Sequence, residues 1–198
     1  MVAKGTRGKR LGSITLAVAL TSPMGRIEAR LADRAGGPAD EARTSERAPT
    51  LTNRRAWPLV HIPAPVARRA LTDALDDAAA RLATPACTRI LTDFAAVTPN
   101  LTDTLDSLDV SIERYLAMVV FIDESRHQLC LGTSLAFTTP GSRVVRVCSN
   151  ELLRQSLSRD HLVAMVIHEV LHTLGLPENP PSSREITRRV LARCGSTK

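Results

Sequence analysis

The chain has 198 residues, of which 43% are hydrophobic and 23% charged, so it is long and apolar enough for one domain with its own core. Its net charge of +6 lies in residues 1–55, which carry 11 Lys and Arg against 5 Asp and Glu; residues 56–198 carry 15 of each. Because the part expected to fold is neutral overall, it lacks the basic surface that binds polyanions, and we expect no nucleic-acid partner.

Residues 1–24 have the layout of a secretory signal peptide. Lys4, Arg7, Lys9 and Arg10 form a basic start, and a short apolar run follows at 14–20. That run is too short to span a bilayer as a helix, so we expect no stable membrane insertion. The sequence therefore predicts a secreted or periplasmic protein, the alternative being a basic tail on a cytosolic one.

Residues 25–56 mix both charges with Gly, Pro, Ser and Thr and hold few large apolar side chains. Such a segment cannot bury enough surface to order itself, so we interpret it as a flexible linker or pro-segment. The pattern changes at Trp57, and residues 57–198 are predicted to form a single domain.

The first half of this domain predicts one long helix and a strand. Apolar residues at helical spacing indicate a helix over Val66–Leu82. The stretch CTRILTDF from Cys87 suggests a short strand, and residues 100–116 a loop passing into a helix near Ile112. The β-branched density of LAMVVFID, from Leu116, is typical of a buried strand.

The second half predicts a hairpin followed by two helices. Residues 134–148 read as two strands around the turn pair Pro140-Gly141. Ser158 can cap a helix over Arg159–Leu174 that Gly175 ends, and Ser182 opens a last helix. We therefore expect an α+β fold: a small mixed or antiparallel sheet with a β-hairpin packed on a buried helix, plus N- and C-terminal helices.

Four cysteines, Cys87, Cys130, Cys148 and Cys194, are spread through the domain without any CxxC pair. An even number of them behind a signal peptide fits two disulfides. Of the three possible connectivities we favour Cys130–Cys148, across the base of the hairpin, with Cys87–Cys194. Four buried free thiols are the alternative if the protein is cytosolic.

The helix over 159–174 is apolar almost all the way round, which indicates that it is buried. His168 and His172 nevertheless lie on one face of it, one turn apart. Two neutral imidazoles on one face suit a divalent metal, most often Zn²⁺, and we expect one such ion. Glu169 projects about 100° away, near enough to take a proton from a water without ligating the metal.

The string HEVLH at 168–172 resembles the HExxH signature of the zincin metallopeptidases. The resemblance covers the motif helix, the turn after it and, in outline, the preceding strand, hairpin and helix. It implies a zincin-like fold and peptide-bond hydrolysis, with His168 and His172 as zinc ligands and Glu169 as general base. A chance match without a metal is the alternative, and it leaves three buried polar groups uncompensated.

A longer string, His168-Glu169-x-x-His172-x-x-Gly175-x-x-Glu178, resembles the metzincin pattern HExxHxxGxxH. It has Glu178 where that family has His, and no Met follows Met165 to form a Met-turn. We favour Glu178 as third ligand because the Gly175 turn brings it back towards the helix. Glu185 is the alternative, as in gluzincins, although Ser182-x-x-Glu185 is also a capping box.

Two further histidines and a tyrosine are also candidates for the metal site or for catalysis. His161 lies on the face of His168, but seven residues of helix rise about 10.5 Å, so it cannot bind the same ion. His127 lies in a polar loop and is expected to be solvated. Tyr115 is either an oxyanion donor or a structural residue, and the oxyanion donor stays unassigned.

Together these features predict a secreted zinc-dependent metallopeptidase that acts on peptide or protein substrates, and we expect a monomer. An extended substrate would lie beside a strand of the 134–148 hairpin. The alternative is a non-catalytic, zinc-stabilised extracellular binding domain, in which a fourth side chain closes the metal site. For the peptidase, residues 25–56 are a candidate inhibitory propeptide, although they hold no Cys or other obvious group to block the metal.

Overall fold

The computed structural model describes residues 57–196, which belong to one compact unit, Pro49–Lys198. The predicted signal peptide (1–24) and linker (25–56) lie outside the described residues. Within residues 57–196, no helix combines the length and the apolar character needed to cross a membrane.

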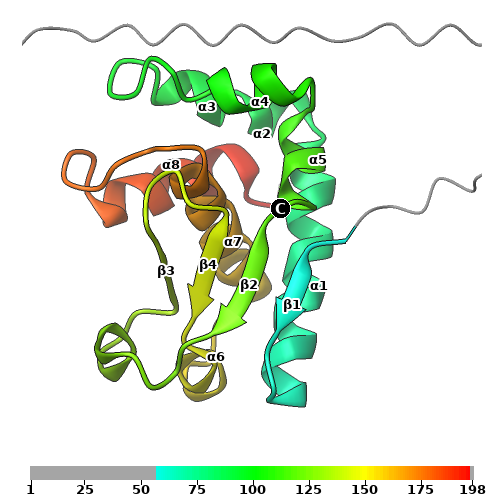
Figure 1. Ribbon diagram of the computed structural model, residues 1–198, viewed down its shortest axis with the longest axis vertical. Coiled ribbons are helices and arrows are strands. Elements are labelled where there is room, and N and C mark those ends of the chain that lie inside the picture. The colour runs from blue at the N-terminus through cyan, green and yellow to red at the C-terminus, as the bar shows by residue number, and fades with distance from the viewer. Residues whose placement is uncertain (1–56, 197–198) are drawn as a thin grey trace, which may run out of the picture. The chain divides into compact units, whose positions relative to one another are not determined.

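A four-stranded mixed sheet runs through the domain in the order β1-β2-β4-β3 (Figure 1). Strands β1, β2 and β4 are parallel, and β3 pairs antiparallel with β4, the two forming a hairpin in which β3 comes first. The sheet is therefore the small mixed one expected, and β3 lies at its edge. The strands are β1 (Leu59–His61), β2 (Val120–Asp123), β3 (Ala136–Thr138) and β4 (Val144–Val147).

One face of this sheet is covered by the two longest helices, α1 (Pro65–Leu82) and α7 (Arg159–Thr173) (Figure 1). Phe121, Val145 and Val147 point from the sheet into that core and are completely buried. The other helices are α2 (Pro85–Thr88), α3 (Ile90–Asp93), α4 (Asp103–Leu108), α5 (Ile112–Leu116), the 3₁₀ helix η1 (Gln128–Leu131), α6 (Ser149–Arg154) and α8 (Ser183–Cys194).

The expected helices, hairpin and helix ends are confirmed, and two expectations are wrong. The stretch from Cys87 forms helical turns instead of a strand, because Pro85 starts α2 and the Thr84 hydroxyl accepts a hydrogen bond from the Cys87 amide. The strand expected from Leu116 begins only at Val120, since Leu116 still belongs to α5. Strand β1 and helices α4 and α6 were not predicted, because they are too short to show a clear hydrophobic periodicity in the sequence.

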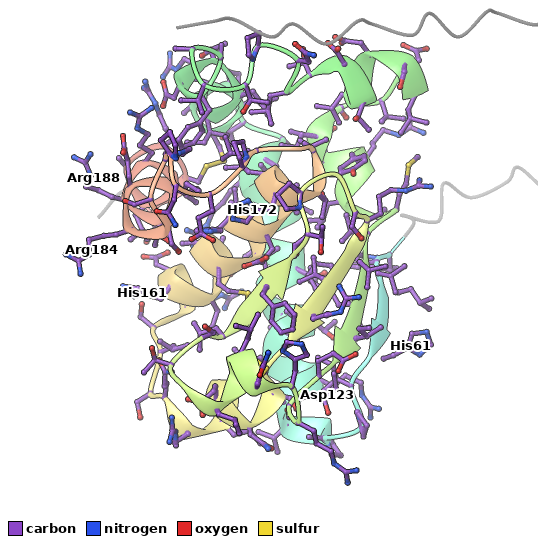
Figure 2. All side chains as sticks on the ribbon, turned by 60° about the vertical axis from the view of Figure 1, so that its left-hand side comes forward. His61, Asp123, His161, His172, Arg184 and Arg188 are labelled. Carbon is purple, nitrogen blue, oxygen red and sulfur yellow. A yellow bond between two sulfur atoms is a disulfide. The ribbon has the colours of Figure 1, made fainter. Side chains whose placement is uncertain are left out.

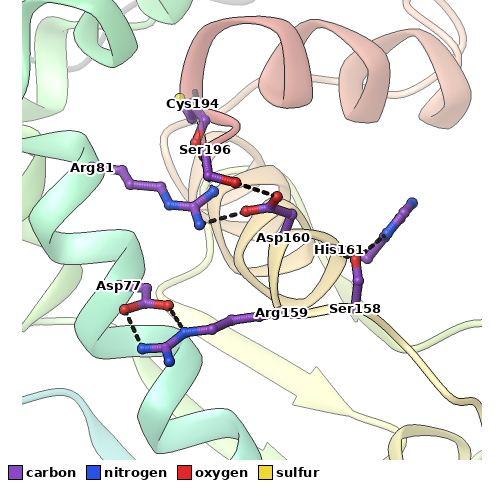
Figure 3. A network of polar contacts seen from close by, with 8 residues as sticks. All are labelled: Asp77, Arg81, Ser158, Arg159, Asp160, His161, Cys194 and Ser196. Atoms are coloured by element: carbon purple, nitrogen blue, oxygen red, sulfur yellow. Dashed lines mark hydrogen bonds and ion pairs between the residues drawn. The ribbon is translucent and has the colours of Figure 1, made fainter. Parts of the chain in front are cut away.

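The N-terminus of α7 is held in place by ion pairs to α1 (Figure 3). Arg159 forms a bidentate pair with Asp77, and Arg81 donates to Asp160 at 2.5 Å. Arg81 also donates to the carbonyl of Cys194 at 2.8 Å. One arginine of α1 therefore joins the start of α7 to the end of α8.

Both disulfides have the favoured connectivity, Cys87–Cys194 and Cys130–Cys148. The first joins α2 to the last residue of α8 across 107 residues of chain, and the second joins η1 to the end of β4 across 18. Only the first disulfide joins segments on either side of α7, the helix that carries the HExxH residues.

Removing the disulfide that closes the longer loop is expected to reduce the folding stability more than removing the other one. A cross-link between residues far apart in the sequence restricts the unfolded chain more. Cys87→Ser with Cys194→Ser should lower the free energy of unfolding by about 4–5 kcal/mol, and Cys130→Ser with Cys148→Ser by about 3 kcal/mol. Urea unfolding of the two double variants measures both losses. A larger loss for the Cys130–Cys148 pair would contradict the loop-length argument.

Candidate metal centre

Three polar side chains lie inside the apolar core on α7. His168, Glu169 and His172 are only 6%, 5% and 4% exposed, and every residue from Val163 to Thr173 is buried. An unpartnered buried polar group costs about 1–3 kcal/mol, and a charge costs more. The helix therefore needs a compensating interaction for these three groups.

The two imidazoles face each other across one turn of α7, with their Nε2 atoms 3.0 Å apart. The other nitrogen of each ring is already engaged: His172 Nδ1 lies 2.7 Å from the carbonyl oxygen of Leu176, and His168 Nδ1 lies 2.9 Å from Thr187 Oγ1. Because a carbonyl only accepts, His172 carries its proton on Nδ1, which leaves Nε2 as a free lone pair. If His168 also carries its proton on Nδ1, the lone pairs of the two Nε2 atoms point towards each other. A bound cation would satisfy both lone pairs.

Burial keeps the His168 ring neutral. The pKa of His168 is lowered to about 4, first because burial disfavours the imidazolium and second because of the neighbouring His172. Neutral imidazole is the form that ligates metal ions, so His168 needs no deprotonation at pH 7.

Glu178 joins the two histidines from the turn after α7. Gly175 has φ +106°, a conformation that favours glycine, and the Leu176 amide donates back to the Leu171 carbonyl at 3.0 Å. This turn brings a carboxylate oxygen of Glu178 and a nitrogen of each imidazole within 4.8 Å of one another. Those three residues could hold a metal ion, with Glu178 on the exposed side.

Glu185, the alternative third ligand, lies outside that group. Its amide is capped by Ser182 Oγ at 3.3 Å, and its carboxylate accepts from Arg189 at 2.5 Å on the same helix. The Ser182 cap accounts for the position of this residue, and the ion pair with Arg189 accounts for its carboxylate.

Glu169 is the least compensated of the buried groups. Its Oε2 is buried without a hydrogen-bond partner, and the pKa of this carboxyl is raised to about 7. Burial is the main cause; the Thr138 hydroxyl on β3 opposes it, and the Glu178 carboxylate adds to it. Thr138 lowers this pKa because its hydroxyl lies near the carboxyl group. The contact does not have hydrogen-bond geometry, since Thr138 Oγ1 is also without a partner. A carboxylate with a pKa near 7 suits a general base.

The hairpin is fixed to the C-terminus of α7 at one carbonyl. His172 O accepts the amide of Gly141, in the β3–β4 turn, at 2.8 Å and the amide of Gly175 at 2.9 Å. Gly141 has φ +82°, which the turn requires. The edge strand β3 and the metal-ligand helix are therefore held together beside the site.

The remaining sequence candidates have structural partners. His161 is exposed and bonds to Ser158 Oγ at the opposite end of α7 from His172, as Figure 2 shows. His127 caps η1 through the Leu129 amide and lies on the ring of Phe137. Tyr115 is fully buried and donates to the Thr173 carbonyl at 3.2 Å, a bond that ties α5 to the end of α7.

Two contacts with the imidazoles had no signal in the sequence. Thr187 follows His168 by nineteen residues in a separate helix, and the Leu176 oxygen belongs to the backbone of the turn. Only the packing of α8 against α7 brings Thr187 to the ring, and a single sequence does not specify that packing angle.

Comparison with protein-family models, curated proteins and solved structures finds no match.

Thr187 is expected to set the orientation of His168. Thr187→Val keeps the shape of the side chain but removes the hydroxyl, and loss of such a partner to a metal-ligating His typically lowers metal affinity about 10- to 100-fold. Competition with a chromogenic Zn²⁺ chelator measures the change. Thr187→Ser, which keeps the hydroxyl, should retain most of the affinity.

The same assay separates the two candidate third ligands. Glu178→Gln should weaken Zn²⁺ binding at least as much as Thr187→Val, because it removes a ligand. Glu185→Gln removes an equal charge from α8 and should leave the affinity nearly unchanged. The reverse order would place the third ligand on α8.

Glu169 should make the metal-free protein less stable as the pH rises. Between pH 4.5 and 7 the unfolded chain has lost this proton while the folded protein retains it, so folding stability falls across that window. Glu169→Gln lacks this penalty. Its free energy of unfolding, relative to wild type, should therefore increase by up to about 3 kcal/mol between pH 4.5 and 7.

Urea unfolding in the presence of a chelator, repeated across this pH range, measures that difference. His168 titrates in both proteins and therefore largely cancels. A difference that stays constant with pH would show that Glu169 is ionised throughout.

Proposed function

We propose that this chain is a secreted zinc-dependent metallopeptidase, with His168, His172 and Glu178 as ligands of one Zn²⁺. The observation that carries the proposal is the convergence of two imidazole Nε2 atoms and a carboxylate beside a buried glutamate whose pKa is about 7. The HExxH resemblance of residues 168–172 supports the same assignment.

The number and type of donors favour zinc in a catalytic setting. Two imidazoles and one carboxylate are a typical catalytic donor set, whereas structural zinc sites have four protein ligands. In residues 57–196 the candidate group contains three ligand residues and no fourth His, Cys, Asp or Glu. All four cysteines are in disulfides and cannot contribute a thiolate. These points favour an enzyme over a zinc-stabilised binding domain.

The metal ion and Glu169 have different roles in the proposed hydrolysis. A bound Zn²⁺ supplies Lewis acidity, which polarises a carbonyl and lowers the pKa of water to about 7. Glu169 takes the proton of the attacking water and then delivers it to the leaving amine. Its position favours this role, because Glu169 Oε2 is buried without a hydrogen-bond partner and is therefore available to accept a proton.

Substrate is proposed to lie as an extended chain along β3. This strand is at the sheet edge, so its outer backbone groups can pair with a peptide, and it contacts α7 directly. The bond between the Gly141 amide and the His172 carbonyl would hold the peptide in register with the ligands.

Secretion is part of the proposal. Two disulfides join the four described cysteines, as in proteins that fold in oxidising compartments. The predicted signal peptide at 1–24 is consistent with that destination.

The decisive experiment compares wild type with Glu169→Gln in metal content and in cleavage of a peptide mixture. The variant should retain about one Zn²⁺ per chain, because Glu169 is not a ligand. Its kcat/KM should fall roughly 10²- to 10⁴-fold, the usual contribution of general acid–base catalysis.

Glu185→Gln serves as the matched control, since it removes one carboxylate that is paired with Arg189. It should retain both zinc and activity. Equal activity in wild type and Glu169→Gln would exclude the proposed mechanism. Zinc bound by an inactive wild type, with a fourth side chain at the ion, would instead indicate the binding domain.

A further inference from the structure

Helix α8 carries a concentration of positive charge that the rest of the domain lacks. Its twelve residues include four arginines and one glutamate, although residues 56–198 are neutral overall. At 100° per residue, the arginines fall on two flanks of the helix: Arg189 and Arg193 on one, Arg184 and Arg188 on the other.

The first flank is paired and serves the fold. Arg193 makes a bidentate pair with Asp93 of α3 at 2.7 and 2.8 Å. Arg189 donates to Glu185 and to the Asp93 carbonyl, and it lies over the ring of Phe94. Together these contacts fix α8 against α3.

The second flank is exposed and unpaired. Arg184 and Arg188 are exposed, and within residues 57–196 neither makes a hydrogen bond, ion pair or ring contact. Figure 2 shows both side chains pointing from α8 in the same direction, away from the body of the domain.

Helix physics gives no stabilising reason for this pair. Like charges at i and i+4 destabilise a helix by about 0.2–0.5 kcal/mol. Arg184 is also in the first turn of α8, where the helix dipole favours acidic residues over cations. Residues that break local rules without a structural gain are expected at functional sites.

The pair lies on the helix that supplies Thr187 to the candidate metal centre. Thr187, which contacts the His168 ring at 2.9 Å, lies directly before Arg188 and one turn after Arg184. On a helix, side chains three apart have Cβ atoms about 5–6 Å from one another. The second flank therefore adjoins the residue that supports a metal ligand, whereas the paired flank faces α3.

We propose that Arg184 and Arg188 bind a carboxylate of the peptide substrate, so that this chain selects acidic peptides. This inference rests on the proposed peptidase function. Guanidinium groups bind carboxylates in bidentate fashion, and two of them one turn apart present a fork for a single acidic group. That group is either an Asp or Glu side chain or the C-terminal carboxylate of the peptide.

The test compares peptides of one sequence that carry Glu or Gln at successive positions, each with a free or an amidated C-terminus. At one position wild type should prefer Glu by roughly 3- to 10-fold in kcat/KM, a preference that falls with added salt. In Arg184→Gln with Arg188→Gln the Glu-to-Gln ratio should fall to about one. A preference that depends on the free C-terminus instead identifies the terminal carboxylate.

The charge-matched control is Arg69→Gln with Arg126→Gln, which removes the same charge at exposed positions on α1 and in the loop after β2. It should keep the wild-type ratio. A wild type without any preference for Glu or for a free C-terminus, or a preference that survives in the Arg184/Arg188 variant, would overturn the proposal.

Thermal unfolding and peptide binding complete the test. The Arg184/Arg188 variant should unfold at the same temperature as wild type or higher, because a like-charge pair is removed; a clear decrease would assign the pair to stability. Fluorescence anisotropy of the labelled Glu and Gln peptides measures affinity without turnover. If no peptide is cleaved, the proposed function fails, but a loss of Glu-peptide affinity in the variant still supports the carboxylate site.

Discussion

The structure depends on one electrostatic constraint: α7 buries two imidazoles and a carboxylate in an apolar core. A helix this deeply buried is normally stabilised by apolar packing alone, and each unpartnered polar group reduces that stabilisation. The fold meets this constraint for the two imidazoles from three sides, and it leaves Glu169 Oε2 without a partner. The Leu176 carbonyl and the Thr187 hydroxyl engage the outer nitrogens, and the turn after α7 brings Glu178 to the inner ones.

That solution explains why several distant segments converge on α7. Arg81 and Asp77 of α1 hold its first turn, Tyr115 of α5 holds its last, and α8 supplies Thr187. The Cys87–Cys194 bond then fixes the far end of α8. The candidate metal centre is thus small, but its geometry depends on contacts spread across most of the domain.

The sequence predicts the parts of this architecture that local chemistry determines. Ser158 and Gly175 give the limits of α7, the Pro140-Gly141 pair gives the hairpin, and the spacing of His168 and His172 places both on one face. The strand expected at Cys87 was wrong because Pro85 and the Thr84 cap favour a helical turn over the apolar pattern. Strand β1, with three residues, was missed because it is too short to show alternation.

What the sequence did not predict is set by packing between elements. Thr187 reaches His168 only because α8 packs against α7 in a particular orientation. Glu178 and Glu185 were both reasonable ligands from spacing alone. Their surroundings differ in the structure, since Glu185 has Ser182 and Arg189 as partners and Glu178 lies beside the imidazoles.

The shared carbonyl of His172 has a consequence for how the molecule could evolve or be redesigned. Surface hairpins usually tolerate insertions, because their turns contact nothing essential. Here the turn amide of Gly141 bonds to the backbone of a candidate metal ligand, so lengthening this hairpin would shift the edge strand relative to the centre.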